Sequence, residues 1–169
     1  MAGLGPGCAP RAREPATETP PRARVGVMDP LPDVLVAPVG GEPTSLRQIV
    51  KGKVAVIDLW ATWCTACKPV AERAKKLAGA TDPARVMVIG VDQGEDDATL
   101  GRYLEGRPEA YPIYADPLLG LSDALGVKEL PTVVVVDAEG RIRRIDHGVT
   151  PELVALVESL SGPAATAAQ

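Results

Sequence analysis

Val54-Ala55-Val56-Ile57-Asp58-Leu59-Trp60 decides the fold of this 169-residue chain, together with the Trp63-Cys64-Thr65-Ala66-Cys67-Lys68 that follows it. The first stretch is an almost continuous apolar run, which predicts a strand inside a sheet covered on both faces. The second places two cysteines at the expected start of a helix, where unpaired N–H groups and a partial positive charge stabilise a thiolate. We therefore expect Cys64 to be a nucleophile near neutral pH, with Cys67 close enough to form a disulfide with it.

Two cysteines at this spacing also occur in structural zinc sites, which need four ligands. The rest of the chain offers Cys8 and a single histidine, His147, so a closed tetrahedral site is disfavoured. A purely structural disulfide is disfavoured too, because a bridge across so short a loop constrains little of the unfolded chain. The preferred interpretation is redox chemistry, with no cofactor besides the Cys64–Cys67 pair itself.

Length and composition predict one folded domain with flexible ends. The net charge of −4 provides no basic face for nucleic acid, and no apolar run reaches the roughly 18–20 residues that cross a bilayer. Residues 1–30 are rich in proline and arginine and are predicted to form a disordered tether. Residues 161–169 are small and polar and are predicted to form a flexible tail. The folded domain is therefore expected over residues 31–160.

Strands and helices are predicted to alternate within this domain, which indicates an α/β fold. One hairpin is expected between residues 33–36 and a partner near Thr44, and a second between 132–136 and 142–145. The other predicted strands are 54–59 and 85–91, and the predicted helices are 67–77, 96–105, 118–125 and one that begins at Thr150-Pro151. Pro69 has no N–H to donate, so the first helix must begin late or bend. Gly126 is expected to end the third.

Three segments resemble thioredoxin-fold proteins, and more narrowly the TlpA/ResA-like thiol-disulfide oxidoreductases of bacterial cell envelopes. They are residues 58–68 with Trp-Cys-x-x-Cys, residues 39–54 before the first central strand, and residues 127–142 with Leu-Pro-Thr. The resemblance spans about residues 31–160 in the family's order. It implies a thioredoxin-like fold, with a central mixed β-sheet flanked by helices, an N-terminal hairpin and a strand–helix insert between residues 91 and 125.

The dipeptide Thr65-Ala66 departs from this family, because it lacks the proline often found between the two cysteines. With the preceding Asp-Leu-Trp it also resembles the thioredoxin-like terminal domain of the DsbD electron transporter. The dipeptide influences the redox potential, so the sequence leaves open whether the protein is a strong or a moderate reductant.

The expected reaction uses Cys64 as the attacking thiolate, because it is the more N-terminal cysteine and is expected to be the more exposed. Cys67 then resolves the mixed disulfide. Asp58 lies in an apolar strand, where a carboxylate is costly unless it is protonated or hydrogen-bonded, so its pKa is expected to be raised. The resemblance implies that Asp58 takes the proton from Cys67. An edge-strand aspartate facing solvent is the alternative.

The resemblance also implies a substrate-binding loop at Leu130-Pro131-Thr132. Pro131 would be a cis-proline that faces the cysteine pair and lets the neighbouring backbone pair with an extended substrate peptide. Leu130 would line the substrate groove and tune reactivity.

Four further residues lie near these motifs. Trp60 is expected to pack in the interior, whereas Trp63 is expected to lie exposed as a contact surface for partners. Lys68 could assist the thiolate electrostatically, but a solvated lysine is the simpler interpretation. His147 is expected to be a surface residue without a catalytic role.

The leading hypothesis is a monomeric oxidoreductase that reduces protein disulfides, with apocytochrome c or another envelope protein as substrate and an upstream thiol as electron donor. One alternative is a thiol-dependent peroxidase of the peroxiredoxin-like group, although peroxiredoxins do not use Trp-Cys-x-x-Cys. Another is a copper or haem delivery module for cytochrome maturation, although the extra His or Met ligands of soft-metal sites are missing. The sequence gives no sign of nucleic-acid binding.

The expected location depends on Cys8. Gly7-Cys8-Ala9 before a proline-rich tether resembles the start of a mature bacterial lipoprotein, with lipid on the cysteine. The seven residues before Cys8 hold no charged and apolar signal segment, so that segment is then expected upstream of a trimmed or misassigned start. The bacterial periplasm or the outer face of the cytoplasmic membrane is therefore favoured. A cytoplasmic location is the alternative if Cys8 is an incidental thiol.

Overall fold

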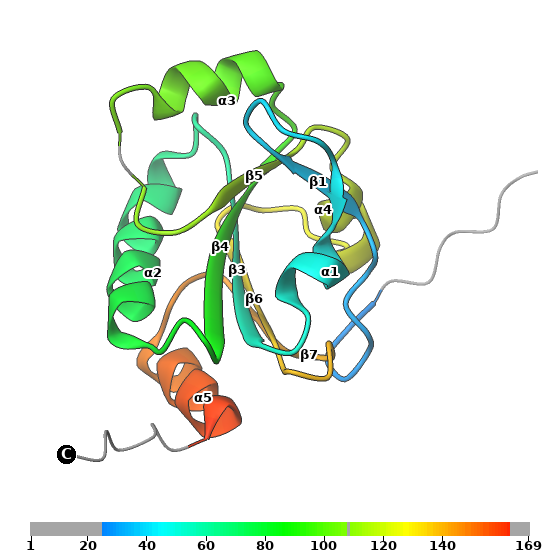
Figure 1. Cartoon of the computed structure of the whole chain (residues 1–169), viewed down its shortest axis with the longest axis vertical. Coiled ribbons are helices and arrows are strands. Elements are labelled where there is room, and N and C mark those ends of the chain that lie inside the picture. Colours follow the sequence, from blue (N-terminus) through cyan, green and yellow to red (C-terminus); the bar gives the residue numbers. More distant parts are fainter. Residues whose placement is uncertain (1–24, 108, 163–169) are drawn as a thin grey trace, which may run out of the picture.

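Helices cover both faces of a central sheet (Figure 1). The structure is a computed structural model and describes residues 25–107 and 109–162. The strands are β1 (Leu35–Pro38), β2 (Thr44–Ser45), β3 (Val54–Trp60), β4 (Val86–Gln93), β5 (Ile113–Asp116), β6 (Thr132–Val136) and β7 (Ile142–Asp146). The helices are α1 (Leu46–Val50), α2 (Lys68–Ala80), α3 (Asp97–Leu104), α4 (Gly120–Leu125) and α5 (Pro151–Ser161), with a 3₁₀ turn η1 (Thr65–Cys67) before α2.

The strands form a mixed sheet in the order β2-β1-β5-β4-β3-β6-β7. Strands β3, β4 and β5 run parallel, while β1, β6 and β7 pair antiparallel with their neighbours. Every residue of β3 is buried, as its apolar run predicts for a strand in the middle of a covered sheet. The expected thioredoxin-like α/β fold is confirmed.

Two apolar layers hold the sheet between its helices. On one face Val54 and Val56 of β3 pack with apolar residues of α2 and α5. On the other face the alternate residues of β3, among them Ile57 and Leu59, pack with residues of α1 and α4. This alternation follows from the two-residue period of a strand, and it places Asp58 on the same face as Val56, toward α2.

Most predicted boundaries hold to within two residues. Helix α2 begins late, at Lys68, with Pro69 in its first turn where a missing N–H costs no hydrogen bond. Helix α4 begins at Gly120 rather than at 118, because Leu119 adopts a left-handed conformation with φ of 57°. The expected caps Gly126 and Thr150 are confirmed.

The first described residues lie against the domain. They belong to the stretch in which a tether was predicted, but the amide of Val25 donates to the carbonyl of Ala124 and that of Met28 donates to Ile142. Pro30 forms a bridge with Arg141. The remainder of the predicted tether, residues 1–24, and residues 163–169 of the predicted tail lie outside the described residues.

Candidate active site

The two cysteines of the Trp-Cys-x-x-Cys motif are joined by a disulfide at the end of β3. Cys64 caps the 3₁₀ turn η1 and Cys67 directly precedes α2, so both lie at the N-terminal ends of helical turns. The amide of Cys64 donates to the carbonyl of Ala61, which closes the turn that leads out of the strand. Cys64 is 6 % exposed and Cys67 2 %, in the order expected from the motif.

The N-terminal end of a helix favours negative charge, so a thiolate released here on reduction is stabilised by backbone N–H groups and by the helix dipole. Lys68, the first residue of α2, is exposed, and its charge is screened by water. The N–H groups at these helical ends are therefore the stabilising groups that the fold itself provides.

Asp58 lies within β3, the central strand that leads to this turn. Its side chain is fully buried, and among the described residues Oδ1 has no hydrogen-bond partner. The Tyr111 hydroxyl donates to Oδ2 at 3.4 Å. Burial raises the pKa of Asp58 to about 7, although the hydrogen bond from Tyr111 acts to lower it. The alternative of a solvent-facing aspartate on an edge strand is therefore wrong.

The loop before β6 contains a cis peptide bond between Leu130 and Pro131, and both residues are partly exposed. His147 also belongs to this neighbourhood, since its Nδ1 lies 3.3 Å from the carbonyl oxygen of Pro131. Thr132 is different. Its side chain is only 1 % exposed and its hydroxyl donates to the carbonyl of Glu129, so this side chain is closed off from a substrate.

The two tryptophans have opposite environments, as expected. Trp60 is buried and its ring lies 5.5 Å from that of Tyr103. Trp63 is 69 % exposed directly beside Cys64. An exposed aromatic side chain next to a reactive sulfur offers an apolar contact for a partner protein.

The sequence analysis did not identify four residues near the site, which are Thr62, Asp92, Glu95 and Tyr111. Tyr111 contacts Asp58, while Glu95 accepts hydrogen bonds from both the amide and the hydroxyl of Thr62, each at 2.6 Å. Asp92 on β4 is fully buried and accepts from the amide of Glu95. Asp92 could have been identified from the sequence in the same way as Asp58, because it is a polar residue within an apolar strand.

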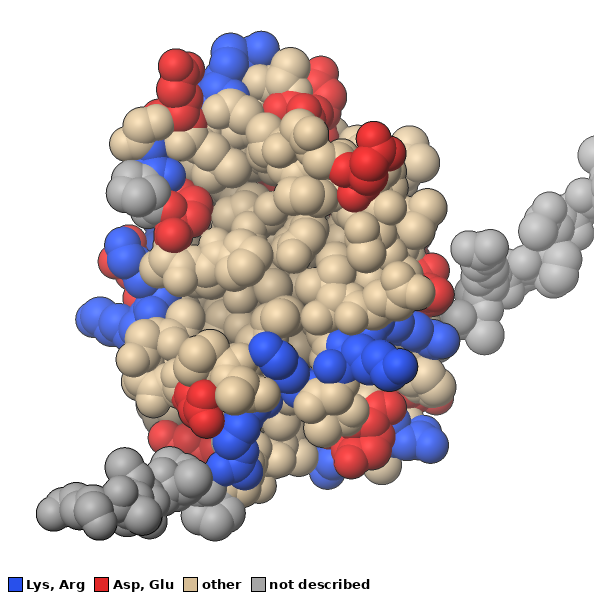
Figure 2. Space-filling model, viewed as in Figure 1, with Lys and Arg blue, Asp and Glu red and all other residues tan. Residues whose placement is uncertain are grey.

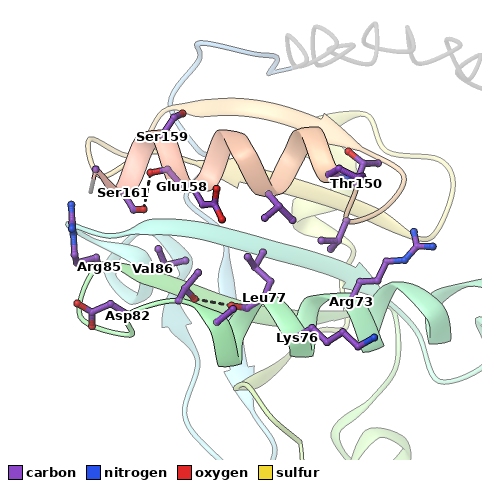
Figure 3. A pocket seen from close by; sticks show the side chains of 16 residues that line it. Arg73, Lys76, Leu77, Asp82, Arg85, Val86, Thr150, Glu158, Ser159 and Ser161 are labelled. Atoms are coloured by element: carbon purple, nitrogen blue, oxygen red, sulfur yellow. Dashed lines mark hydrogen bonds between the residues drawn. The ribbon is translucent and has the colours of Figure 1, made fainter. Parts of the chain in front are cut away.

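Two cavities of different size lie near α2. The smaller, of about 50 Å³, is lined by both cysteines together with Trp60, Tyr111 and other residues. The larger, of about 960 Å³, lies between α2 and α5 and includes neither cysteine (Figure 3). Its floor is apolar, with Leu77 and Val86, and charged side chains such as Arg73 and Lys76 lie at its edge. The cavity that borders the two cysteines is therefore the smaller one.

The rest of the surface offers few other functional features. In Figure 2 the charged side chains lie mainly around the rim of the visible face and its centre is largely uncharged. Among residues 25–107 and 109–162, His, Cys, Asp and Glu side chains form no group of three or more that could hold a metal ion. Within the same ranges no helix is both long and apolar enough to cross a membrane.

Comparisons with known proteins show the family to which the chain belongs. Residues 27–145 match the sequence model of the AhpC/TSA family. The chain is 30 % identical over 115 residues to the thiol-disulfide oxidoreductase ResA of Halalkalibacterium halodurans, an alignment that covers 68 % of this chain and 65 % of that protein. It is 31 % identical over 128 residues to the thiol:disulfide interchange protein DsbE of Pseudomonas fluorescens, covering 74 % of this chain and 68 % of the relative.

A solved structure shares the fold. The crystal structure of a protein described as a thiol-disulfide oxidoreductase, from Bacteroides vulgatus, superposes with a TM-score of 0.73 at 24 % identity. The match covers 79 % of this chain and 96 % of that one. The chain thus spans about two thirds of the curated relatives' length and nearly the whole of the solved domain.

Proposed function

This chain belongs to the AhpC/TSA family, among the thiol-disulfide oxidoreductases of the ResA/DsbE type, and we propose that it reduces protein disulfides in the bacterial cell envelope. The observation that carries the proposal is the Cys64–Cys67 disulfide at the start of α2, with a buried carboxyl in the strand before it and a cis-proline loop nearby. The disulfide is the oxidised state of a pair whose reduced form would carry two electrons.

The proposed reaction begins when the Cys64 thiolate attacks one sulfur of a substrate disulfide. A mixed disulfide forms and the other substrate sulfur leaves as a thiolate, which takes up a proton from water. Cys67 then gives its proton to Asp58 and attacks the Cys64 sulfur, which releases the second substrate thiolate and forms the Cys64–Cys67 bridge. A dithiol donor must return two electrons before the next turnover.

The proposal includes two kinds of partner, a polypeptide substrate and an electron donor. Exposed Trp63 and the partly exposed Leu130 and Pro131 offer an apolar surface and a backbone edge to an extended peptide. The substrate would be a polypeptide with an accessible disulfide, such as an apocytochrome c, and the electron donor a protein dithiol. We further propose a monomer that is tethered to the membrane through Cys8, which lies outside the described residues.

Cysteine variants test the exchange chemistry. Cys64→Ser is expected to abolish dithiothreitol-dependent reduction of insulin, whereas Cys67→Ser is expected to accumulate a mixed disulfide that mass spectrometry detects. Cys8→Ser is the matched control, since it removes the third thiol, and should retain full turnover. Full activity of Cys64→Ser would refute the proposed function.

A peroxide assay tests the peroxidase alternative, which the AhpC/TSA match keeps relevant. The reduced protein is mixed with hydrogen peroxide and excess thiol, and peroxide loss is compared with insulin reduction. Insulin reduction without rapid peroxide loss supports the proposal. Rapid loss that requires Cys64, without insulin reduction, would assign the peroxidase activity instead.

The midpoint potential of the Cys64–Cys67 couple tests the direction of electron flow. A value near that of thioredoxin, about −270 mV, is expected for a reductant that must be supplied with electrons. A value near about −120 mV would indicate an oxidant that donates disulfides, and the proposed direction would be wrong.

A further inference from the structure

Strand β4 carries a glycine directly beside Asp58. Gly90 is the register partner of Asp58 in the parallel β3–β4 pair. A Cβ atom at Gly90 would lie 2.6 Å from Cδ1 of Ile113, 3.0 Å from Nε1 of Trp60 and 3.3 Å from the ring of Tyr111. Glycine inside a strand often marks such a close approach. The space that a side chain on β4 would fill is therefore taken by Trp60 of β3, by Ile113 at the start of β5 and by Tyr111 just before it.

Tyr111 uses this space to reach the buried carboxyl. Its hydroxyl donates to Oδ2 of Asp58, and the two residues are 53 positions apart in the sequence. Tyr111 is 8 % exposed, and its ring also lines the small cavity beside Cys64 and Cys67. Tyr111 thus contacts the carboxyl through its hydroxyl and also borders the cavity next to the two sulfurs.

We propose that Tyr111 is the positioning residue for the proton acceptor of the resolving step. Its ring fills part of the space over Gly90 and keeps water from Asp58, while its hydroxyl holds the carboxyl in place. The inference rests on the proposed function, because it assigns a partner to the step in which Cys67 loses its proton to Asp58, bonds to Cys64 and releases the substrate thiolate.

The ring and the hydroxyl act on Asp58 in opposite directions. Burial, to which the ring contributes, disfavours the charged form and raises the pKa of Asp58, whereas the hydrogen bond stabilises the carboxylate and lowers it. Together they leave the pKa at about 7, where a useful fraction of the carboxyl can accept a proton near neutral pH. A residue with only a packing role would have a single effect.

Other charged groups near this pair are exposed. Glu109 and Lys68 line the small cavity, and Glu72 on α2 adds to the negative potential at Tyr111. All three are exposed, so water screens them. On either side of Asp58 in the sheet, β4 and β6 present Gly90 and Val133, which carry no charge.

Two substitutions separate the two roles. Tyr111→Phe keeps the ring and removes the hydroxyl, so the pKa of Asp58 should rise by roughly half a unit to one unit. Tyr111→Ala opens the cavity to water, so the pKa should fall toward that of an ordinary carboxyl. The pKa is measured by NMR titration of the Asp58 side-chain carbon in the oxidised protein. Tyr114→Phe is the control, because it removes a hydroxyl from the opposite face of the sheet and should shift nothing.

The kinetic readout is a single turnover. The reduced protein is mixed with dithiobis(nitrobenzoate), and the release of the second thionitrobenzoate reports the attack of Cys67 on the Cys64 mixed disulfide. The pH midpoint of this rate should move upward in Tyr111→Phe and downward in Tyr111→Ala. An unchanged Asp58 titration in Tyr111→Phe would overturn the proposal, and an upward shift in Tyr111→Ala would overturn the role of the ring. The titration needs no substrate, so its failure is distinguishable from failure of the proposed function.

Discussion

The region around Asp58 and the region around Asp92 present the same buried group in different settings. The two aspartates lie on adjacent parallel strands, and both are fully buried. Each has one oxygen without a hydrogen-bond partner among the described residues. Burial raises the pKa of Asp58 to about 7, and burial together with the neighbouring Glu95 raises that of Asp92 to about 8. Burial alone therefore does not distinguish the two.

Their partners do distinguish them. Asp58 contacts the neutral Tyr111 at the cavity that borders the disulfide. Asp92 contacts Glu95, which in turn holds the amide and hydroxyl of Thr62, two residues before Cys64. Partial burial acts to raise the pKa of Glu95, but the hydrogen bonds from Asp92 and Thr62 lower it. Asp58 is thus hydrogen-bonded to a residue that borders the disulfide, whereas Asp92 is linked through Glu95 to the turn that carries the cysteines.

The largest expected difference is in the rate of the resolving step. Asp58→Asn removes the proton acceptor and should slow the second thionitrobenzoate release by about a hundredfold or more at pH 7. Asp92→Asn keeps a donor toward Glu95 and should change this rate by less than about threefold. Stopped-flow measurement on both variants makes the comparison, and equal rates for the two would remove the distinction between the regions.

A second expected effect is on the pH dependence of stability. In the oxidised protein the folded state holds the Asp58 proton up to about pH 7, whereas the unfolded chain releases it near pH 4. Folding stability must therefore fall as the pH rises across this window, by about 4 kcal/mol in total. Asp58→Asn removes this loss, so the variant should be more stable than the wild type at pH 8 and about equal at pH 4.

Urea denaturation at both pH values measures the effect. Asp92→Asn should gain at least as much at pH 8, because burial and the neighbouring Glu95 raise the pKa of Asp92 to about 8. If Asp58→Asn is no more stable than the wild type at pH 8, the carboxyl of Asp58 is not buried as the structure has it.

The sequence was most informative where the local pattern and the tertiary role agree. The apolar run of β3 predicted a central strand, and the lone Asp58 within it predicted a buried carboxyl with a raised pKa. The position of Pro69 predicted the late start of α2. In each case residues next to one another in the chain carry the physical cause.

Contacts between segments that are distant in the sequence could not be predicted from it. Tyr111 lies 53 residues from Asp58 and just before the four-residue strand β5, which no clear periodicity marks. Gly90 is the one residue whose type hinted at the contact between Tyr111 and Asp58, because a glycine in an apolar strand indicates a close approach of another segment. Nothing in the local sequence pairs Glu95 with Thr62, since their meeting depends on the parallel register of β3 and β4.

The smallest expected effect concerns the Glu95–Thr62 contact. Thr62→Val removes the hydroxyl that donates to Glu95 and leaves a carboxylate oxygen without that partner, so stability should fall by about 1 to 2 kcal/mol. Thr62→Ser keeps the hydroxyl and should lose much less. Because Thr62 does not contact Asp58, neither variant should move the Asp58 titration. A shift in Thr62→Val, measured by the same NMR titration, would mean that the two regions are coupled through the turn and that the anchor also tunes the proton acceptor.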